Sequence, residues 1–239
     1  MQFPSSLSIQ DQLKQQAAQL AVDYVHMSLA EDAVIGVGTG STVNFFIELL
    51  AGGKHKRRWR GAISSSEAST ARLLAHGIPV LSLNDVDDLP IYVDGADEIT
   101  AAGFMLKGGG GALTREKIVA SVASKFVCIA DSKKYVEFLG TFPIPVEVIP
   151  MARAAVSRQI KHIFPQAHIT VRSQAEGVPF VTDNGCEILD IRDVQLSDPR
   201  TAERNLELIV GVVSVGIFAQ RPANKLFLAT EAGVRTIDF

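Results

Sequence analysis

The sequence has few of the residues that mark a metal centre, a disulfide framework or a membrane anchor. Two cysteines and five histidines occur in 239 residues, and neither set has the spacing of metal ligands. Cys128 and Cys186 lie far apart without a CxxC partner, which predicts reduced thiols and a cytoplasmic location. No apolar run approaches the roughly 20 residues of a membrane span, and the first residues lack the basic start and apolar core of a signal peptide. We therefore expect neither a metal nor a membrane partner.

An excess of positive charge is also missing. The chain has 23 Lys and Arg residues against 26 Asp and Glu, a formal net charge of −3. Such a balance lacks the electrostatic footprint of a nucleic-acid-binding protein. The one basic run, residues 54–60 (KHKRRWR), is more typical of a solvated loop ahead of a strand. We expect no nucleic-acid partner, whereas the hydrophobic content of 47% is that of a soluble globular protein with a sizeable core.

Glycine, in contrast, is concentrated in a few places. Residues 106–117 read LKGGGGALTREK, with four consecutive glycines. Glycine loses the most conformational freedom on folding, so such a run suits a backbone that must approach a ligand with its N–H groups. A helix is predicted to follow, with Thr114 as its N-cap and Glu116 in its first turn. With Lys107, this loop can bind and deprotonate a small oxygen-rich anion.

The same loop has a simpler interpretation. Acidic residues are common in the first turn of a helix because they complement its dipole. A glycine-rich segment can also be a flexible connection. The loop alone leaves these alternatives open.

A second glycine-rich turn follows a short apolar strand, residues 33–37. The turn reads GTGST (residues 38–42) and leads into a helix predicted over residues 42–50. It has neither the spacing of a dinucleotide fingerprint nor the GKS or GKT of a P-loop. A small phosphate fits better, because the helix N-terminus attracts anions and the hydroxyls of Thr39, Ser41 and Thr42 add donors. The alternative is a tight turn in which these hydroxyls only cap the helix.

Two further strands are predicted to end in polar residues. The strand at residues 91–93 is followed by three carboxylates, and the strand at residues 125–130 by a second polar cluster. Ligands of open α/β sheets bind outside the carboxyl ends of the strands. The carboxylates can bind sugar hydroxyls, share a proton or bind a divalent cation, and Asp94 can alternatively satisfy only the backbone of its own turn. The two clusters are Asp94, Asp97 and Glu98, and Asp131, Ser132, Lys133 and Lys134.

The order of elements predicts an α/β protein with a mainly parallel, Rossmann-like sheet flanked by helices. Three prolines in residues 142–150 mark a boundary, after which a helix with antiparallel strands and an Asn184-Gly185 turn indicates a smaller α+β domain. We expect domains at residues 1–142 plus 222–239 and at residues 143–221. Further helices are predicted at residues 11–25, 67–76, 151–163 and 202–209, and further strands at 61–64, 80–83, 168–172, 179–191, 212–218 and, as a pair, in 225–239.

Four motifs in this order, GVGTGST, VDGADEI, LKGGGGALTREK and FVCIADSKK, make the chain resemble ribose-5-phosphate isomerase of the A type. The resemblance runs from about Lys14 to the end. It implies a cofactor-free interconversion of ribose 5-phosphate and ribulose 5-phosphate in the pentose phosphate pathway, by a homodimer or a larger assembly.

The resemblance also implies roles for matching residues. Glu116 matches the catalytic base, Lys107 and the glycines stabilise the enediolate, and Asp94 assists ring opening. Lys134 matches a lysine that binds the phosphate, with Lys133 as the alternative, and Lys14 matches a further lysine near the phosphate. The complete implied substrate site is Lys14, Thr39, Gly40, Ser41, Thr42, Asp94, Gly95, Ala96, Asp97, Lys107, Gly108, Gly109, Gly110 and Lys134.

Two other classes of function remain open. One is a different sugar-phosphate enzyme, such as another isomerase, a deaminase or a CoA-transferase-like protein. The other is a sugar-phosphate sensor that binds without turnover. The isomerase hypothesis requires Glu116 and the glycine amides to face the same pair of sugar carbons, so burial of Glu116 in a remote salt bridge would contradict it.

Overall fold

The computed structural model describes residues 7–30, 32–52 and 60–239. Its backbone contacts divide the chain into a first unit (Met1–Gly95, Val119–Tyr135 and Ala223–Phe239) and a second unit (Ala96–Ile118 and Val136–Pro222). This division groups Ala96–Ile118, with its glycine loop, with the segment predicted as the smaller domain. In the described ranges, no helix is long and apolar enough to cross a membrane.

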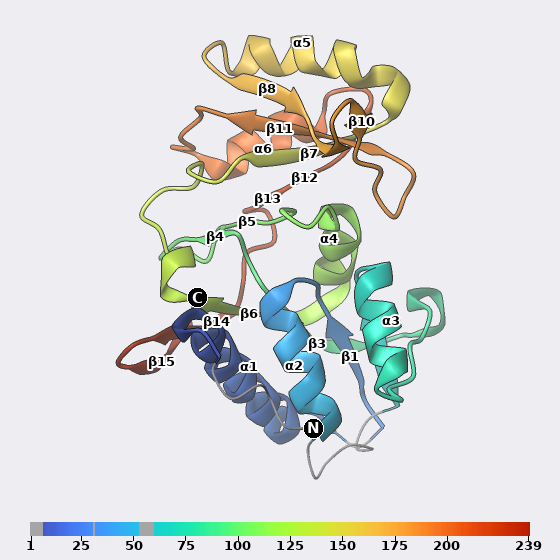
Figure 1. Ribbon diagram of the computed structural model, residues 1–239, viewed down its shortest axis with the longest axis vertical. Coiled ribbons are helices and arrows are strands. Elements are labelled where there is room, and N and C mark those ends of the chain that lie inside the picture. Colours follow the sequence, from blue (N-terminus) through green and yellow to red (C-terminus); the bar gives the residue numbers. More distant parts are fainter. Residues whose placement is uncertain (1–6, 31, 53–59) are drawn as a thin grey trace. The chain divides into compact units, whose positions relative to one another are not determined.

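The first unit is built on a six-stranded sheet in the order β15-β14-β6-β3-β1-β2 (Figure 1). Neighbouring strands are parallel, except that β15 pairs antiparallel with β14. The predicted α/β fold with a mainly parallel sheet is thus confirmed, and so is the return of the C-terminal tail to this sheet. The strands are β1 (Val34–Val37), β2 (Gly61–Ser64), β3 (Leu89–Asp94), β6 (Ala123–Asp131), β14 (Lys225–Thr230) and β15 (Gly233–Asp238).

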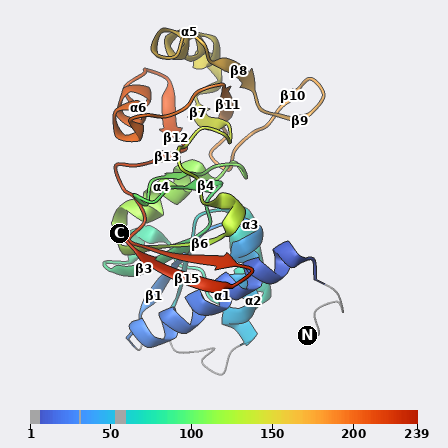
Figure 2. The same ribbon diagram turned by 90° about the vertical axis from the view of Figure 1, so that its left-hand side faces the viewer.

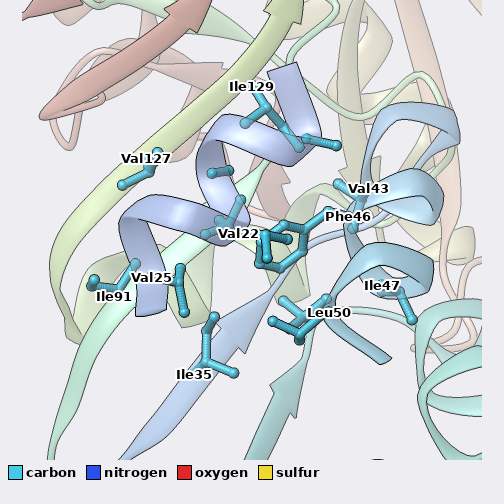
Figure 3. Close-up of a cluster of buried hydrophobic side chains, with 14 of the residues drawn as sticks. Val22, Val25, Ile35, Val43, Phe46, Ile47, Leu50, Ile91, Val127 and Ile129 are labelled. Atoms are coloured by element: carbon cyan, nitrogen blue, oxygen red, sulfur yellow. The ribbon is translucent and has the colours of Figure 1, made fainter. Parts of the chain in front are cut away.

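Helices α1 (Ile9–Ser28) and α2 (Ser41–Gly52) pack on one face of this sheet (Figure 3). Alternate strand residues, such as Ile35 and Val93, meet Val22 and Phe46 of the two helices there, as the period-two geometry of strands requires. Helix α1 also runs along β14 and β15 (Figure 2). The remaining helices of this unit are α3 (Glu67–Ala75) and the end of α4 (Leu113–Val122).

The second unit contains a four-stranded antiparallel sheet in the order β12-β7-β11-β8. Its helices share a core with alternate residues of the central strands, among them Val146 and Leu189. This is the predicted α+β pattern, and Asn184-Gly185 forms the expected turn with Gly185 at φ 74°. The elements are β7 (Ile144–Val148), β8 (His168–Val171), β11 (Glu187–Arg192), β12 (Val212–Val215), α5 (Arg153–Ile163) and α6 (Pro199–Glu207), with a hairpin of β9 (Ser173–Ala175) and β10 (Val178–Pro179).

A small three-stranded sheet in the second unit supports the glycine loop. It consists of β4 (Glu98–Ile99), β5 (Met105–Leu106) and β13 (Ile217–Phe218). Its pairing continues past β5, because the Lys107 N–H donates to the Gly216 carbonyl at 2.8 Å. Three 3-10 turns, η1 (Leu83–Asp85), η2 (Ser132–Lys134) and η3 (Pro150–Ala152), complete the described elements.

Four local predictions are wrong. The first strand expected in residues 179–191 is reduced to β10 (Val178–Pro179) and a single bridge between Val181 and Glu187. The strand expected at residues 80–83 is a single bridge between Val80 and Ala62, followed by η1. The strand expected at residues 212–218 is divided at Gly216, whose N–H turns to the Pro145 carbonyl at 2.7 Å. Thr114 is not the N-cap of α4, because the helix already begins at Leu113. Most of the basic run at residues 54–60 lies outside the described residues.

Candidate active site

The glycine loop follows directly from β5 and ends at the first turn of α4. Gly108 and Gly111 adopt φ values of 104° and 81°, which residues with a side chain rarely adopt. At Gly108 the space is also filled, since an added Cβ would lie 2.9 Å from Leu113. Gly109 and Gly110 are exposed, and an added Cβ at Gly110 would meet nothing within 4 Å. The loop therefore presents bare backbone to solvent.

Lys107 and Glu116 are paired at the two ends of this loop. Lys107 Nζ lies 3.2 Å from Glu116 Oε2, and the two side chains are 3% and 4% exposed. Lys107 Nζ also lies 5.6 Å from the centre of the Phe218 ring. Glu116 occupies the first turn of α4, as predicted, where an acidic side chain complements the helix dipole. The salt bridge of Glu116 is thus made with the other residue of the implied catalytic pair.

Asp97 accepts a hydrogen bond from the backbone of the loop. The Gly109 N–H donates to Asp97 Oδ2 at 2.7 Å, and an added Cβ at Gly109 would lie 2.7 Å from Asp97 Oδ1. The Asp97 side chain is half-buried. Carboxylate, ammonium and glycine amides are consequently gathered in one segment of the second unit.

The start of α4 is anchored to the turn at residues 182–186. The Thr114 hydroxyl donates to Glu147, which is fully buried in β7 and also accepts from Thr182 Oγ1 at 2.6 Å. Arg115 Nε donates to Asn184 Oδ1 at 3.0 Å. Burial, together with the charge of Glu147, raises the pKa of the Cys186 thiol in this turn. These contacts fix the direction in which α4 carries Glu116.

In the first unit, the predicted phosphate turn leads into α2, which begins at Ser41. Gly40 has a φ of 107°, and Gly40 and Ser41 are exposed. The first N–H groups of a helix have no acceptor within the helix, so those at the start of α2 can bind an anion. The Thr39 hydroxyl accepts a hydrogen bond from Ser66 Oγ at 2.8 Å.

Asp94 is the structural centre of the phosphate turn. Its carboxylate is fully buried, and Oδ1 accepts the N–H groups of Thr39 at 3.0 Å and Gly95 at 2.7 Å. The Tyr92 hydroxyl donates to Oδ2. Gly38 makes room for this arrangement, because an added Cβ would lie 2.0 Å from Asp94 Cγ. Asp94 therefore bonds its own turn through Gly95, as the simpler interpretation expects, and in addition holds the turn at residues 38–42 through Thr39.

The three polar strand ends are neighbours, since β1, β3 and β6 are adjacent and parallel. Lys133 and Lys134 lie in η2 at the end of β6, Lys133 exposed and Lys134 half-buried. Lys14 lies on α1, where its ammonium is 3.3 Å from Asp11. Glu98, in contrast, has a structural role, because its carboxylate accepts the N–H groups of Gly140 and Phe142.

Comparison with known proteins identifies the family. A family model of ribose 5-phosphate isomerase A (phosphoriboisomerase A) matches residues 61–233. The ribose 5-phosphate isomerase A from Neisseria gonorrhoeae is 43% identical, with a TM-score of 0.89 over 98% of this chain and 99% of that one. The chain belongs to the ribose 5-phosphate isomerase A family.

Other solved ribose 5-phosphate isomerases are also similar. The enzyme from Methanocaldococcus jannaschii is 35% identical, with a TM-score of 0.88 over 96% of this chain and 99% of that one. A D-ribose-5-phosphate isomerase in complex with phospho-erythronic acid is 35% identical, with a TM-score of 0.89 over 97% of this chain and 100% of that one. The resemblance seen in the four motifs is confirmed, and the protein is a member of a family of isomerases.

The sequence motifs did not indicate three side chains that contact the predicted site residues or the elements that hold them. Tyr92 shares the face of β3 with Asp94, so alternation along the strand could have indicated it. Glu147 and Arg172 come from the second unit, and each contacts the loop or α4 over a long sequence separation. Such contacts leave no local signal in a single sequence.

Proposed function

We propose that the protein interconverts D-ribose 5-phosphate and D-ribulose 5-phosphate through an enediolate, with Glu116 as the general base. The observation that carries this proposal is the buried Lys107–Glu116 pair beside the glycine loop. It brings a proton acceptor, a cation and backbone donors to one place, as proton abstraction next to a carbonyl requires.

In the first step, Glu116 removes the proton from C2 of the open-chain aldose. The electrons of that C–H bond form the C1–C2 double bond, and the carbonyl electrons move to O1. Protonated Glu116 then delivers a proton to C1, either the one it removed or one exchanged with solvent, while the O2 proton is transferred to O1 and C2 becomes the carbonyl. General base catalysis of this kind typically contributes about 10²–10⁴-fold.

Lys107 and the amides of the glycine loop stabilise the enediolate oxygens in this proposal. Support comes from the exposed backbone of Gly109 and Gly110 and from the ammonium next to Glu116. Removal of one oxyanion donor typically lowers the rate by about 10²–10³. Electrostatic stabilisation is therefore as important here as the base.

The two aspartates have different proposed tasks. Asp97 is half-buried and already aligned with the Gly109 amide, which supports a role in binding sugar hydroxyls and in ring opening. Asp94 is proposed to assist ring opening as well, and its bond to the Thr39 amide makes it responsible for the shape of the phosphate turn. Gly95 and Ala96 connect the two.

The phosphate is proposed to bind at Gly40, Ser41 and Thr42, at the start of α2. The exposed glycine and the positive end of the helix dipole support this assignment. Lys134, with Lys133 as the alternative, and Lys14 supply charge. One solved relative is a complex with phospho-erythronic acid, a phosphorylated sugar acid, which supports a sugar-phosphate ligand here.

We also propose a cytoplasmic homodimer that acts in the pentose phosphate pathway without a cofactor. The test is turnover of ribose 5-phosphate in D₂O, followed by proton NMR with and without a chelator. Ribulose 5-phosphate that carries deuterium at C1, formed at a rate that the chelator does not change, supports the proposal. Conversion without any deuterium fits direct return of the C2 proton by Glu116 as well as hydride transfer, and wild-type turnover in Glu116→Gln would then exclude the base. Absence of conversion would favour the sensor or another sugar-phosphate enzyme.

A further inference from the structure

Arg172 contacts the backbone of the glycine loop over a long separation in the sequence. It follows β8, and its Nη1 donates to the carbonyls of Gly108 at 2.7 Å and Gly109 at 3.2 Å. The same guanidinium is held by Asp190 of β11, with Nε to Oδ2 at 3.0 Å and Nη2 to Oδ1 at 2.5 Å. The Arg172 and Asp190 side chains are 14% and 11% exposed.

These two contacts determine where the loop's N–H groups point. In a planar trans peptide, the C=O and the N–H lie on opposite sides. The carbonyl of Gly108 shares its peptide with the N–H of Gly109, and the carbonyl of Gly109 shares its peptide with the N–H of Gly110. With both carbonyls turned to Arg172, both N–H groups are turned away from it, and the Gly109 N–H accordingly meets Asp97.

The loop cannot hold this orientation by itself. Consecutive glycines have many accessible backbone conformations and no side chains to restrict them. An arginine suits the task because its planar fork can bind a carboxylate through two N–H groups and still donate from the third nitrogen. Phe180 also restricts the loop, since its ring lies 6.0 Å from the Arg172 guanidinium and fills the space next to Gly111.

We propose that Arg172, held by Asp190, is a positioning residue that turns the Gly109 amide to Asp97 and aims the Gly110 amide at the enediolate oxygen. This inference rests on the proposed function and deepens it. Arg172 acts through the loop rather than on the substrate, so its loss misdirects the donors without removing them. Because a misplacement of about 1 Å can lower a rate 10²-fold, we expect kcat to fall by about 10–100-fold and KM to change much less.

The test uses Arg172→Met and Arg172→Lys in the full chain, with Arg153→Met as the matched control. Arg153 also pairs with a carboxylate of β11, Glu187, at 2.9 Å, but it has no contact with the glycine loop among the described interactions. Arg172→Lys keeps the charge and loses the fork. We expect both Arg172 variants to lose kcat, and Arg153→Met to keep wild-type kcat and KM.

A second readout does not depend on turnover. Hydrogen exchange of the Gly109 amide, measured by NMR on glycine-labelled protein, reports its bond to Asp97. We expect faster exchange in both Arg172 variants and in Asp190→Asn, and unchanged exchange in Arg153→Met. Unchanged Gly109 exchange with a wild-type kcat in Arg172→Lys would overturn the inference. If the wild type itself fails to convert ribose 5-phosphate, the proposed function is wrong, while Gly109 exchange still decides the role of Arg172.

Discussion

Lys107 Nζ and Glu116 Oε2 are 3.2 Å apart in a pair that water hardly reaches. Removal of one partner from such a buried pair leaves an uncompensated charge, which typically destabilises a protein by roughly 3–5 kcal/mol. The two residues are therefore coupled in stability as well as in the proposed chemistry. For a variant at either position, both the free energy of unfolding and the catalytic rate must be measured.

Lys107→Met should lower kcat by about 10²–10³, because it removes the proposed oxyanion donor. KM should rise less than kcat falls, since the phosphate turn lies elsewhere in the sequence. Steady-state kinetics on ribose 5-phosphate provide the measurement. A change confined to KM would show that Lys107 binds the ground state and does not stabilise the enediolate.

The stability of the pair is testable by a double-mutant cycle of Lys107→Met and Glu116→Gln. We expect the double variant to be less destabilised than the sum of the single variants, because each single change leaves the other charge alone. Urea unfolding of the four proteins gives the coupling free energy. Additive losses would mean that the 3.2 Å contact contributes nothing in solution.

Gly38→Ala should weaken substrate binding through Asp94. The new Cβ would lie 2.0 Å from Asp94 Cγ, so the carboxylate must move and lose its bond to the Thr39 amide. A hydrogen bond to a charged group contributes about 1.5–3 kcal/mol, so we expect KM to rise by about tenfold or more. Gly52→Ala in the same segment is the control, because its Cβ meets nothing within 4 Å. Equal KM values in the two variants would contradict the role of Asp94.

Tyr92→Phe removes the hydroxyl that donates to Asp94 Oδ2 and leaves the packing of the ring on Phe126 intact. We expect a loss of about 1.5–3 kcal/mol in the free energy of unfolding, together with a higher KM. Tyr24→Phe serves as the control, since its hydroxyl accepts a long 3.4 Å bond from Lys125. If Tyr92→Phe were as stable and active as Tyr24→Phe, Asp94 would not depend on this bond.

Much of the fold was predictable from the sequence, since apolar strands and helices alternate and local periodicity carries that information. The exceptions arose where long-range contacts override local pattern. Gly216 turns out of its strand to bond Pro145, and the apolar residues near Val80 make a single bridge to Ala62.

The sequence indicated those candidate site residues that lie close together in one motif. The sequence indicated Lys107, the glycines and Glu116 as one segment, and the structure pairs the first with the last. It did not separate the carboxylates proposed to bind the substrate from the structural ones. Glu98 binds the amides of Gly140 and Phe142, which lie more than 40 residues further along the chain and follow no sequence motif.

Glu116→Gln shows whether the carboxylate is the general base, because the change keeps the shape of the side chain and removes its basicity. Binding of phospho-erythronic acid, measured by calorimetry, shows whether the variant site is intact, and turnover of ribose 5-phosphate shows whether the base is needed. We expect a dissociation constant near that of the wild type and a kcat lower by at least about 10²–10⁴. Wild-type turnover in Glu116→Gln would contradict the role of Glu116 as the base.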